Sequence, residues 1–184
     1  MQKAIQKIIF LLIMSLHFIF LTGILIDNFN HPFPALSLIP ISGLLIYFYF
    51  KTEKNYPKFL RKRDLLTVQA VTLGAIITYF LHVEFQLGVV LAAGIVGLIG
   101  SLIPYLKKGS GLLREVPAAM YCGAFAGMTA PGLANGYLFI FYAGMLTGIL
   151  LVLAKNMFIG YGGKLGTLAF GGVSIVYSVI YLFT

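Results

Sequence analysis

Apolar residues dominate seven consecutive stretches of this chain, and none of these stretches contains Lys, Arg, Asp or Glu. Crossing a hydrocarbon layer about 30 Å thick takes about 20 apolar residues in a helix, and every stretch is long enough. We therefore predict seven membrane-spanning helices. The predicted spans are Ile8–Ile26, Asn28–Phe50, Leu65–Val83, Phe85–Leu106, Val116–Ala134, Asn135–Ala154 and Leu165–Thr184.

The basic residues lie between these spans in an alternating pattern. If each span crosses once, all thirteen Lys and Arg residues fall on the same side. The opposite side then has Asp27, His31, His82 and Glu84 as its titratable side chains. Lys and Arg near short loops are retained on the cytoplasmic side during insertion. We therefore expect an all-α, polytopic integral membrane protein, a seven-helix transmembrane bundle with its amino terminus inside and its carboxyl terminus outside.

Composition agrees with this prediction. Hydrophobic residues make up 60% of the chain and charged residues 10%, whereas soluble domains carry about 25% charged residues. We expect residues 1–184 to form a single transmembrane domain in the bacterial inner membrane. The net charge of +8 then belongs to the inner face, where each cation near anionic lipid contributes about 1 kcal/mol, and it does not indicate nucleic-acid binding. The single cysteine, Cys122, is expected to be a small buried hydrophobic residue.

The fifth span is predicted to be a short or broken helix. Pro117 suits a first helical turn, whereas Pro131 with Gly132 cannot continue a regular helix. The helical part would run from Pro117 to Thr129, or about 20 Å at 1.5 Å per residue. A full crossing is favoured over a re-entrant loop, because a re-entrant loop would place Lys155, and with it Lys164, outside.

Glycine is concentrated in residues 88–183. Eighteen of the twenty-one glycines lie between Gly88 and Gly172. Small residues let membrane helices approach closely, so these helices are expected to pack tightly and to favour a homo-oligomer. Two pairs have the small-xxx-small spacing: Gly123 with Gly127, and Gly144 with Gly148.

A pathway for a solute is expected around the fifth span, whose small residues leave space and whose Thr129 could expose a hydroxyl near freed carbonyls. His17 is added because an ionisable side chain deep in a span is costly when charged. The alternatives are a close-packed helix contact for the fifth span and a neutral, hydrogen-bonded imidazole for His17. The candidate pathway residues are His17, Gln69, Thr72, Tyr121, Gly123, Gly127 and Thr129.

The start of the last helix is a candidate anion or lipid-headgroup site at the inner face. Free N–H groups and the helix dipole favour an anion there, and the segment does not have the spacing of a phosphate-binding loop. The alternative is a turn whose lysine touches a lipid phosphate. The candidate residues are Lys155, Lys164, Gly163 and Thr167.

Residues 51–64 form the longest polar segment and are predicted to be a basic cytoplasmic loop. Such a loop could rest on anionic lipid headgroups or recruit a cytoplasmic protein. Its cations are Lys51, Lys54, Lys58, Arg61, Lys62 and Arg63.

No motif typical of metal-dependent or nucleophilic catalysis occurs in the sequence, so no enzyme activity, metal or cofactor is expected. The absence of carboxylates within the spans disfavours a cation carrier. The leading hypothesis is a small transporter or channel for a neutral or anionic solute. Two alternatives are a non-catalytic membrane subunit that recruits a cytoplasmic partner or binds substrate for a multi-part importer, and an intramembrane enzyme that acts on lipid.

Overall fold

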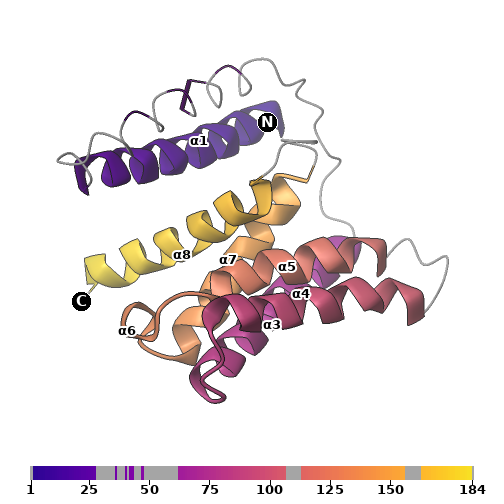
Figure 1. Cartoon of the computed structure of the whole chain (residues 1–184). Coiled ribbons are helices and arrows are strands. Elements are labelled where there is room, and N and C mark those ends of the chain that lie inside the picture. Colours follow the sequence, from indigo (N-terminus) through magenta and orange to yellow (C-terminus); the bar gives the residue numbers. More distant parts are fainter. Residues whose placement is uncertain are drawn as a thin grey trace. The chain divides into compact units, whose positions relative to one another are not determined.

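The computed structural model of the chain describes residues 2–27, 36, 40, 42–43, 47, 62–106, 113–155 and 163–183. Every regular element in these ranges is a helix (Figure 1). The chain divides into two compact units, Met1–Pro57 with Asn156–Tyr161 and Lys58–Lys155 with Gly162–Thr184. The single domain expected from the sequence therefore stays a prediction, and each unit is described by itself.

The first unit contains α1 (Gln2–Asp27), a helix of 26 residues. Large apolar side chains such as Ile8, Leu11 and Ile19 are exposed along it, as expected of a helix surrounded by lipid. The predicted second span and most of the basic loop lie outside the described residues.

The second unit contains the remaining helices. Three of them are long and apolar enough to cross a membrane, namely α3 from Asp64 onward, α4, and α8 as far as Leu182. The chain is thus a membrane protein by the length and composition of its helices. The elements are α3 (Lys62–Val83), α4 (Val89–Leu106), the 3₁₀ turn η1 (Leu113–Glu115), α5 (Val116–Gly127), α6 (Pro131–Ala134), α7 (Tyr137–Leu153) and α8 (Lys164–Phe183).

Two predicted helix boundaries differ from the structure for local reasons. Helix α4 begins at Val89 rather than Phe85, because the turn after α3 includes Gln86 in a left-handed conformation with φ 53°. The fifth helix is short, as the sequence predicts, and α5 ends at Gly127. It is followed by the four-residue α6, which begins at Pro131.

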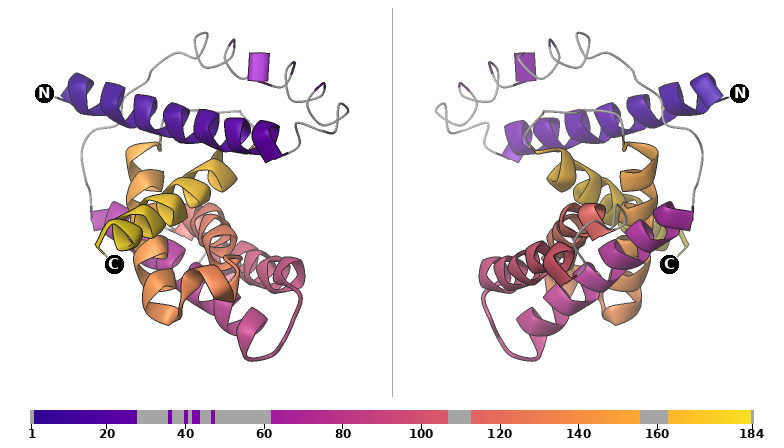
Figure 2. Two further views of the ribbon diagram at one scale, coloured as in Figure 1. Left: turned by 90° about the vertical axis from the view of Figure 1, so that its left-hand side faces the viewer. Right: turned by 90° about the vertical axis from the view of Figure 1, so that its right-hand side faces the viewer.

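Helix α3 is the central element of the second unit, because both α5 and α7 pack against it (Figure 2). A β carbon added at Gly127 of α5 would lie 2.8 Å from Cβ of Thr78. One added at Gly148 of α7 would lie 2.8 Å from Cα of Val68. Side chains at these glycines would overlap α3, so the backbones approach as closely as small residues allow.

The outer helices of this unit use the same type of contact. Gly100 of α4 lies against Met120 of α5, where an added β carbon would be 3.0 Å from the Met120 Cβ. Gly172 of α8 faces α7, where an added β carbon would lie 2.8 Å from the backbone nitrogen of Thr147. The glycines at these positions therefore serve helix contacts within one copy of the chain. The expected homo-oligomer stays a prediction.

Candidate functional site

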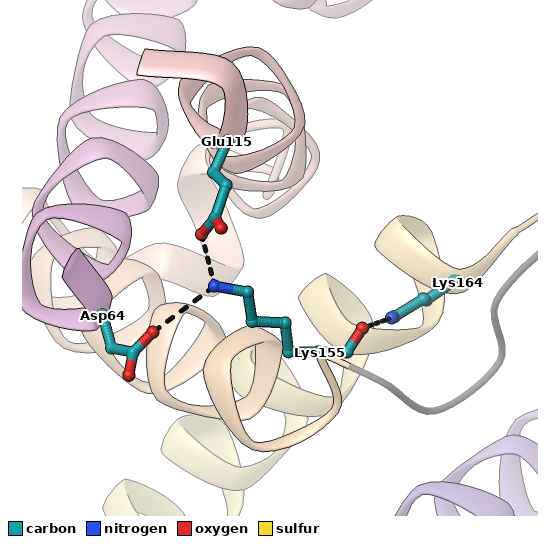
Figure 3. Close-up of polar contacts among 4 residues, drawn as sticks. All are labelled: Asp64, Glu115, Lys155 and Lys164. Atoms are coloured by element: carbon teal, nitrogen blue, oxygen red, sulfur yellow. Dashed lines mark hydrogen bonds and ion pairs between the residues drawn. The ribbon is translucent and has the colours of Figure 1, made fainter. Parts of the chain in front are cut away.

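An ion-pair cluster centred on Lys155 joins the ends of three elements (Figure 3). The Lys155 ammonium nitrogen donates a hydrogen bond of 2.6 Å to Oε2 of Glu115 and lies 3.6 Å from Oδ1 of Asp64. Glu115 ends η1, and Asp64 lies in the first turn of α3. The Asp64 side chain is 9% exposed, whereas those of Lys155 and Glu115 are 38% and 34% exposed.

Lys155 also contacts the last helix through its backbone. Its carbonyl oxygen accepts a hydrogen bond of 3.1 Å from the Lys164 ammonium group at the start of α8. Lys155 is therefore linked to α3 and η1 by its side chain and to α8 by its main chain. Because it lies two residues after the end of α7, this one residue joins the ends of four helical segments.

The positions of the charges agree with the helix dipoles. Asp64 and Glu115 lie at or just before the amino-terminal ends of α3 and α5, where negative charge is favoured. Lys155 lies just beyond the carboxyl-terminal end of α7, where positive charge is favoured. The backbone N–H of Lys155 bonds the carbonyl of Val152, which keeps the residue close to the last turn of α7.

Two of the residues predicted to bind an anion at the inner face, Lys155 and Lys164, belong to this cluster. The Lys155 charge is balanced by two carboxylates, which the sequence analysis did not anticipate. Gly163 has a left-handed φ of 82°, and its carbonyl accepts hydrogen bonds from both the backbone and the hydroxyl group of Thr167. An anion-binding role for these residues stays a prediction.

The candidate pathway residues in the second unit face different neighbours. Gly123 and Gly127 lie against the backbone of α3. Thr72 is buried, donates to the carbonyl of Val68 at 2.9 Å, and lies against Gly144 of α7. All three residues lie in helix contacts, and for Gly123 and Gly127 this is the arrangement that the alternative interpretation of the fifth span describes.

The other candidates point elsewhere. Gln69 is exposed, and the ring of Tyr121 contacts Gly97 of α4 and packs at 4.6 Å from the ring of Phe125. His17 belongs to the first unit. Within the second unit, the structure does not gather the remaining candidates into one site. Their roles in a pathway stay predictions.

The break after α5 provides a second polar feature. The Thr129 hydroxyl donates to the carbonyl of Ala126 at 2.7 Å, next to the end of the helix. The following stretch includes exposed Ala130 and Pro131, and it ends at Asn135 with φ 47° and Gly136 with φ 112°. A short connection that contains α6 and several exposed residues thus separates α5 from α7.

The segment that contains this break runs from one end of α3 to the other. Glu115, at its start, shares Lys155 with Asp64 at the beginning of α3. Tyr137, at its end, donates a hydrogen bond of 2.8 Å to Glu84, one residue after α3 ends. A re-entrant segment would return to the end at which it started, so the geometry of the second unit agrees with the predicted full crossing.

Most of the predicted basic loop lies outside the described residues. Lys51, Lys54, Lys58 and Arg61 lie outside the described residues. For Lys62 and Arg63 the structure describes the helical backbone of α3 and not the side chains. Recruitment of a protein or of lipid by this loop stays a prediction.

Sequence reasoning missed the part played by Asp64 and Glu115. The predicted topology places both on the same side as Lys155, at the starts of the third and fifth spans. Acidic and basic residues at helix ends on one side of the membrane could have indicated an ion pair. The distances between their charged groups depend on how the helices pack and could not be predicted. Within the residues that the structure describes, no group of three or more His, Cys, Asp or Glu side chains is arranged to hold a metal ion.

Comparisons with protein-family models, with curated proteins and with solved structures find no match to this chain.

Proposed function

We propose that this chain is a seven-span membrane protein that passes a small neutral or anionic solute along the broken fifth segment. The observation that carries this proposal is the position of the break. Helix α5 ends at Gly127, which lies beside Ala75 and Thr78 of α3. At 1.5 Å per residue, Thr78 is about 20 Å along α3 from Asp64 and about 8 Å from Val83.

This position supports a break within the hydrocarbon layer if α3 spans it, since that layer is about 30 Å thick. Ala130, Pro131 and Asn135, which follow the break, are exposed in the described structure. Irregular backbone at membrane depth is tolerated where it is buried in protein or lines a water-filled cavity. A water-filled path along this stretch satisfies that requirement.

The ends of the neighbouring helices suggest what the path accepts. The amino-terminal end of α7 offers N–H groups that no side chain caps, so a solute with hydrogen-bond acceptors matches this end. At the end of α5, the carbonyls of Ala124, Phe125 and Ala126 already accept hydrogen bonds from Met128 and Thr129. Glu84, which is hydrogen-bonded to Tyr137, adds negative charge near the start of α7 and favours a neutral solute over an anion.

The test is solute flux into proteoliposomes that contain the full-length protein. Glycerol and urea represent neutral solutes, and nitrate and acetate represent anions, with light scattering as the readout. We expect at least one neutral solute to enter faster than into empty vesicles. Entry of all four at the rate of empty vesicles would overturn the proposal.

A matched pair of variants tests the route. Ala130→Trp adds a large ring in the exposed stretch after α5, and Ala118→Trp adds the same ring at an exposed position near the start of α5. We expect flux to fall in the first variant and to stay at the wild-type rate in the second. Equal flux in the two variants would contradict a path along the break.

A further inference from the structure

We propose that Glu84 makes the path along the break selective for neutral solutes over anions, an inference that rests on the proposed passage of a solute. Glu84 follows the last residue of α3, and its Oε1 accepts a hydrogen bond of 2.8 Å from the hydroxyl group of Tyr137. Tyr137 is the first residue of α7. The carboxylate therefore lies within the length of one tyrosine side chain of the end of the connection between α5 and α7.

Tyr137 is held in place by a buried aromatic ring of α3. The rings of Tyr79 and Tyr137 pack edge to face, with their centroids 5.2 Å apart and their planes at 88°, an arrangement that is favourable for aromatic pairs. Tyr79 is 3% exposed and lies in one buried cluster with Ala134 of α6. The carboxylate thus has a defined position, although Glu84 itself is exposed.

The charge of Glu84 opposes the polarity of the α7 end. The first N–H groups of α7 have no side-chain cap, and the start of a helix carries about half a positive elementary charge. No Lys or Arg occurs in residues 77–90 or 128–141, which include this end of α3, α6 and the start of α7. One full negative charge outweighs the half charge of the helix, so the local field repels anions. Without Glu84 the same end would attract them.

The carboxylate is close enough to act on a solute in the break. Thr78, which lies beside the last residue of α5, precedes Glu84 by six residues, or about 9 Å along α3 at 1.5 Å per residue. A unit charge at this distance changes the local concentration of a monovalent anion about twofold at the dielectric constant of water, and about twentyfold at the value of about 20 that suits protein surfaces. A neutral solute has no net charge on which this field acts. Glu84 can therefore set selectivity without touching the solute.

The experiment compares the entry of isotope-labelled nitrate and glycerol into proteoliposomes that contain the full-length protein. The ionic strength is about 0.01 M, where charges act over about 30 Å, and potassium with valinomycin balances the charge of nitrate. Glu84→Gln removes the charge and keeps an oxygen that can accept from Tyr137. We expect this variant to raise the ratio of the nitrate rate to the glycerol rate about twofold to twentyfold.

Two further variants separate charge from shape. Glu84→Asp shortens the side chain but keeps the charge, so the ratio should stay near the wild-type value. Tyr137→Phe keeps the ring and the carboxylate but removes the hydrogen bond between them, so the ratio should rise less than in Glu84→Gln. At about 1 M salt, where charges act over about 3 Å, the wild-type ratio should approach that of Glu84→Gln. This salt dependence tests the inference in the wild type if Glu84→Gln does not fold.

The outcomes separate the inference from the proposed function. Glycerol entry with the same ratio in the wild type and Glu84→Gln, or an equal rise in Glu84→Asp and Glu84→Gln, would overturn the selectivity and retain the path. Faster entry of nitrate than of glycerol in the wild type would do the same. Entry of neither solute above the rate of empty vesicles would refute the path and the selectivity together.

Discussion

Gly123 of α5 lies so close to α3 that its hydrogen atom cannot be replaced by a methyl group without movement. An added β carbon would overlap the carbonyl oxygen of Val71 and would lie 3.0 Å from the nitrogen of Ala75. Both are backbone atoms, which cannot rotate away as a side chain can. We predict that Gly123→Ala lowers the free energy of unfolding by about 1–3 kcal/mol, measured as thermal loss of helical circular dichroism in detergent.

Gly94 of α4 provides the matched control for this substitution. It also lies within a helix, but an added β carbon would meet nothing within 4 Å. Alanine is the better helix former, so Gly94→Ala should leave the melting temperature unchanged or raise it. An equal fall in melting temperature in the two variants would mean that glycine is needed at these positions for a reason other than contact with α3.

For single residues, the sequence predicts the side of the membrane on which a residue lies better than it predicts which residues it contacts. The alternation of charges places Asp64, Glu115 and Lys155 on one predicted side, and the structure brings them into an ion-pair cluster. The pairing itself could not be predicted, because it depends on which helix ends become neighbours. The same limit applies to Gly123, for which the spacing suits a helix contact or an open path equally well.

The turn between α6 and α7 depends on the backbone of Gly136. Its φ of 112° and ψ of −180° lie in a region that residues with a β carbon rarely adopt. We predict that Gly136→Ala lowers the free energy of unfolding by about 1–3 kcal/mol, measured by the same thermal assay. The cause would be backbone strain, since an added β carbon would meet nothing within 4 Å.

Two nearby substitutions test this explanation. Gly132→Ala in α6 also adds a methyl group in open space but without a left-handed backbone, so its stability should equal that of the wild type. Asn135→Gly should also be tolerated, because glycine adopts the φ of 47° found there. A loss in Gly132→Ala as large as that in Gly136→Ala would argue against strain as the cause.

At the level of elements, the apolar stretches predict both ends of α3, α4, α7 and α8 to within four residues, whereas α1 begins six residues before its predicted span. Pro131 indicates correctly that the fifth helix cannot continue. The earlier end at Gly127 could not be predicted, because the residues from Met128 to Ala130 have no strong helix-breaking character. Packing decides this boundary: Ala126 and Ala134 lie in one buried cluster with Tyr79, so the chain must fold back toward α3 after α5.

For the whole molecule, the directions of the helices in the second unit support the predicted topology. Gly148 of α7 contacts Val68 and Gly144 contacts Thr72, so α7 runs antiparallel to α3. Gly123 and Gly127 contact successively later residues of α3, so α5 runs parallel to it. This alternation is what consecutive crossings require, whereas the side of the membrane at each end rests on the positive-inside pattern.

Single cysteines on either side of the broken segment test this topology directly. In a Cys122→Ala background, Asn135→Cys lies near the Glu84 end of α3 and Arg114→Cys near the Asp64 end, and both positions are exposed. An impermeant maleimide added to intact cells should modify the cysteine at 135 at once and the cysteine at 114 only after permeabilisation. Modification of both from the outside, or of neither, would place the two ends on one side of the membrane. The segment between Glu115 and Tyr137 would then be re-entrant, and a solute path along it would lose its exit.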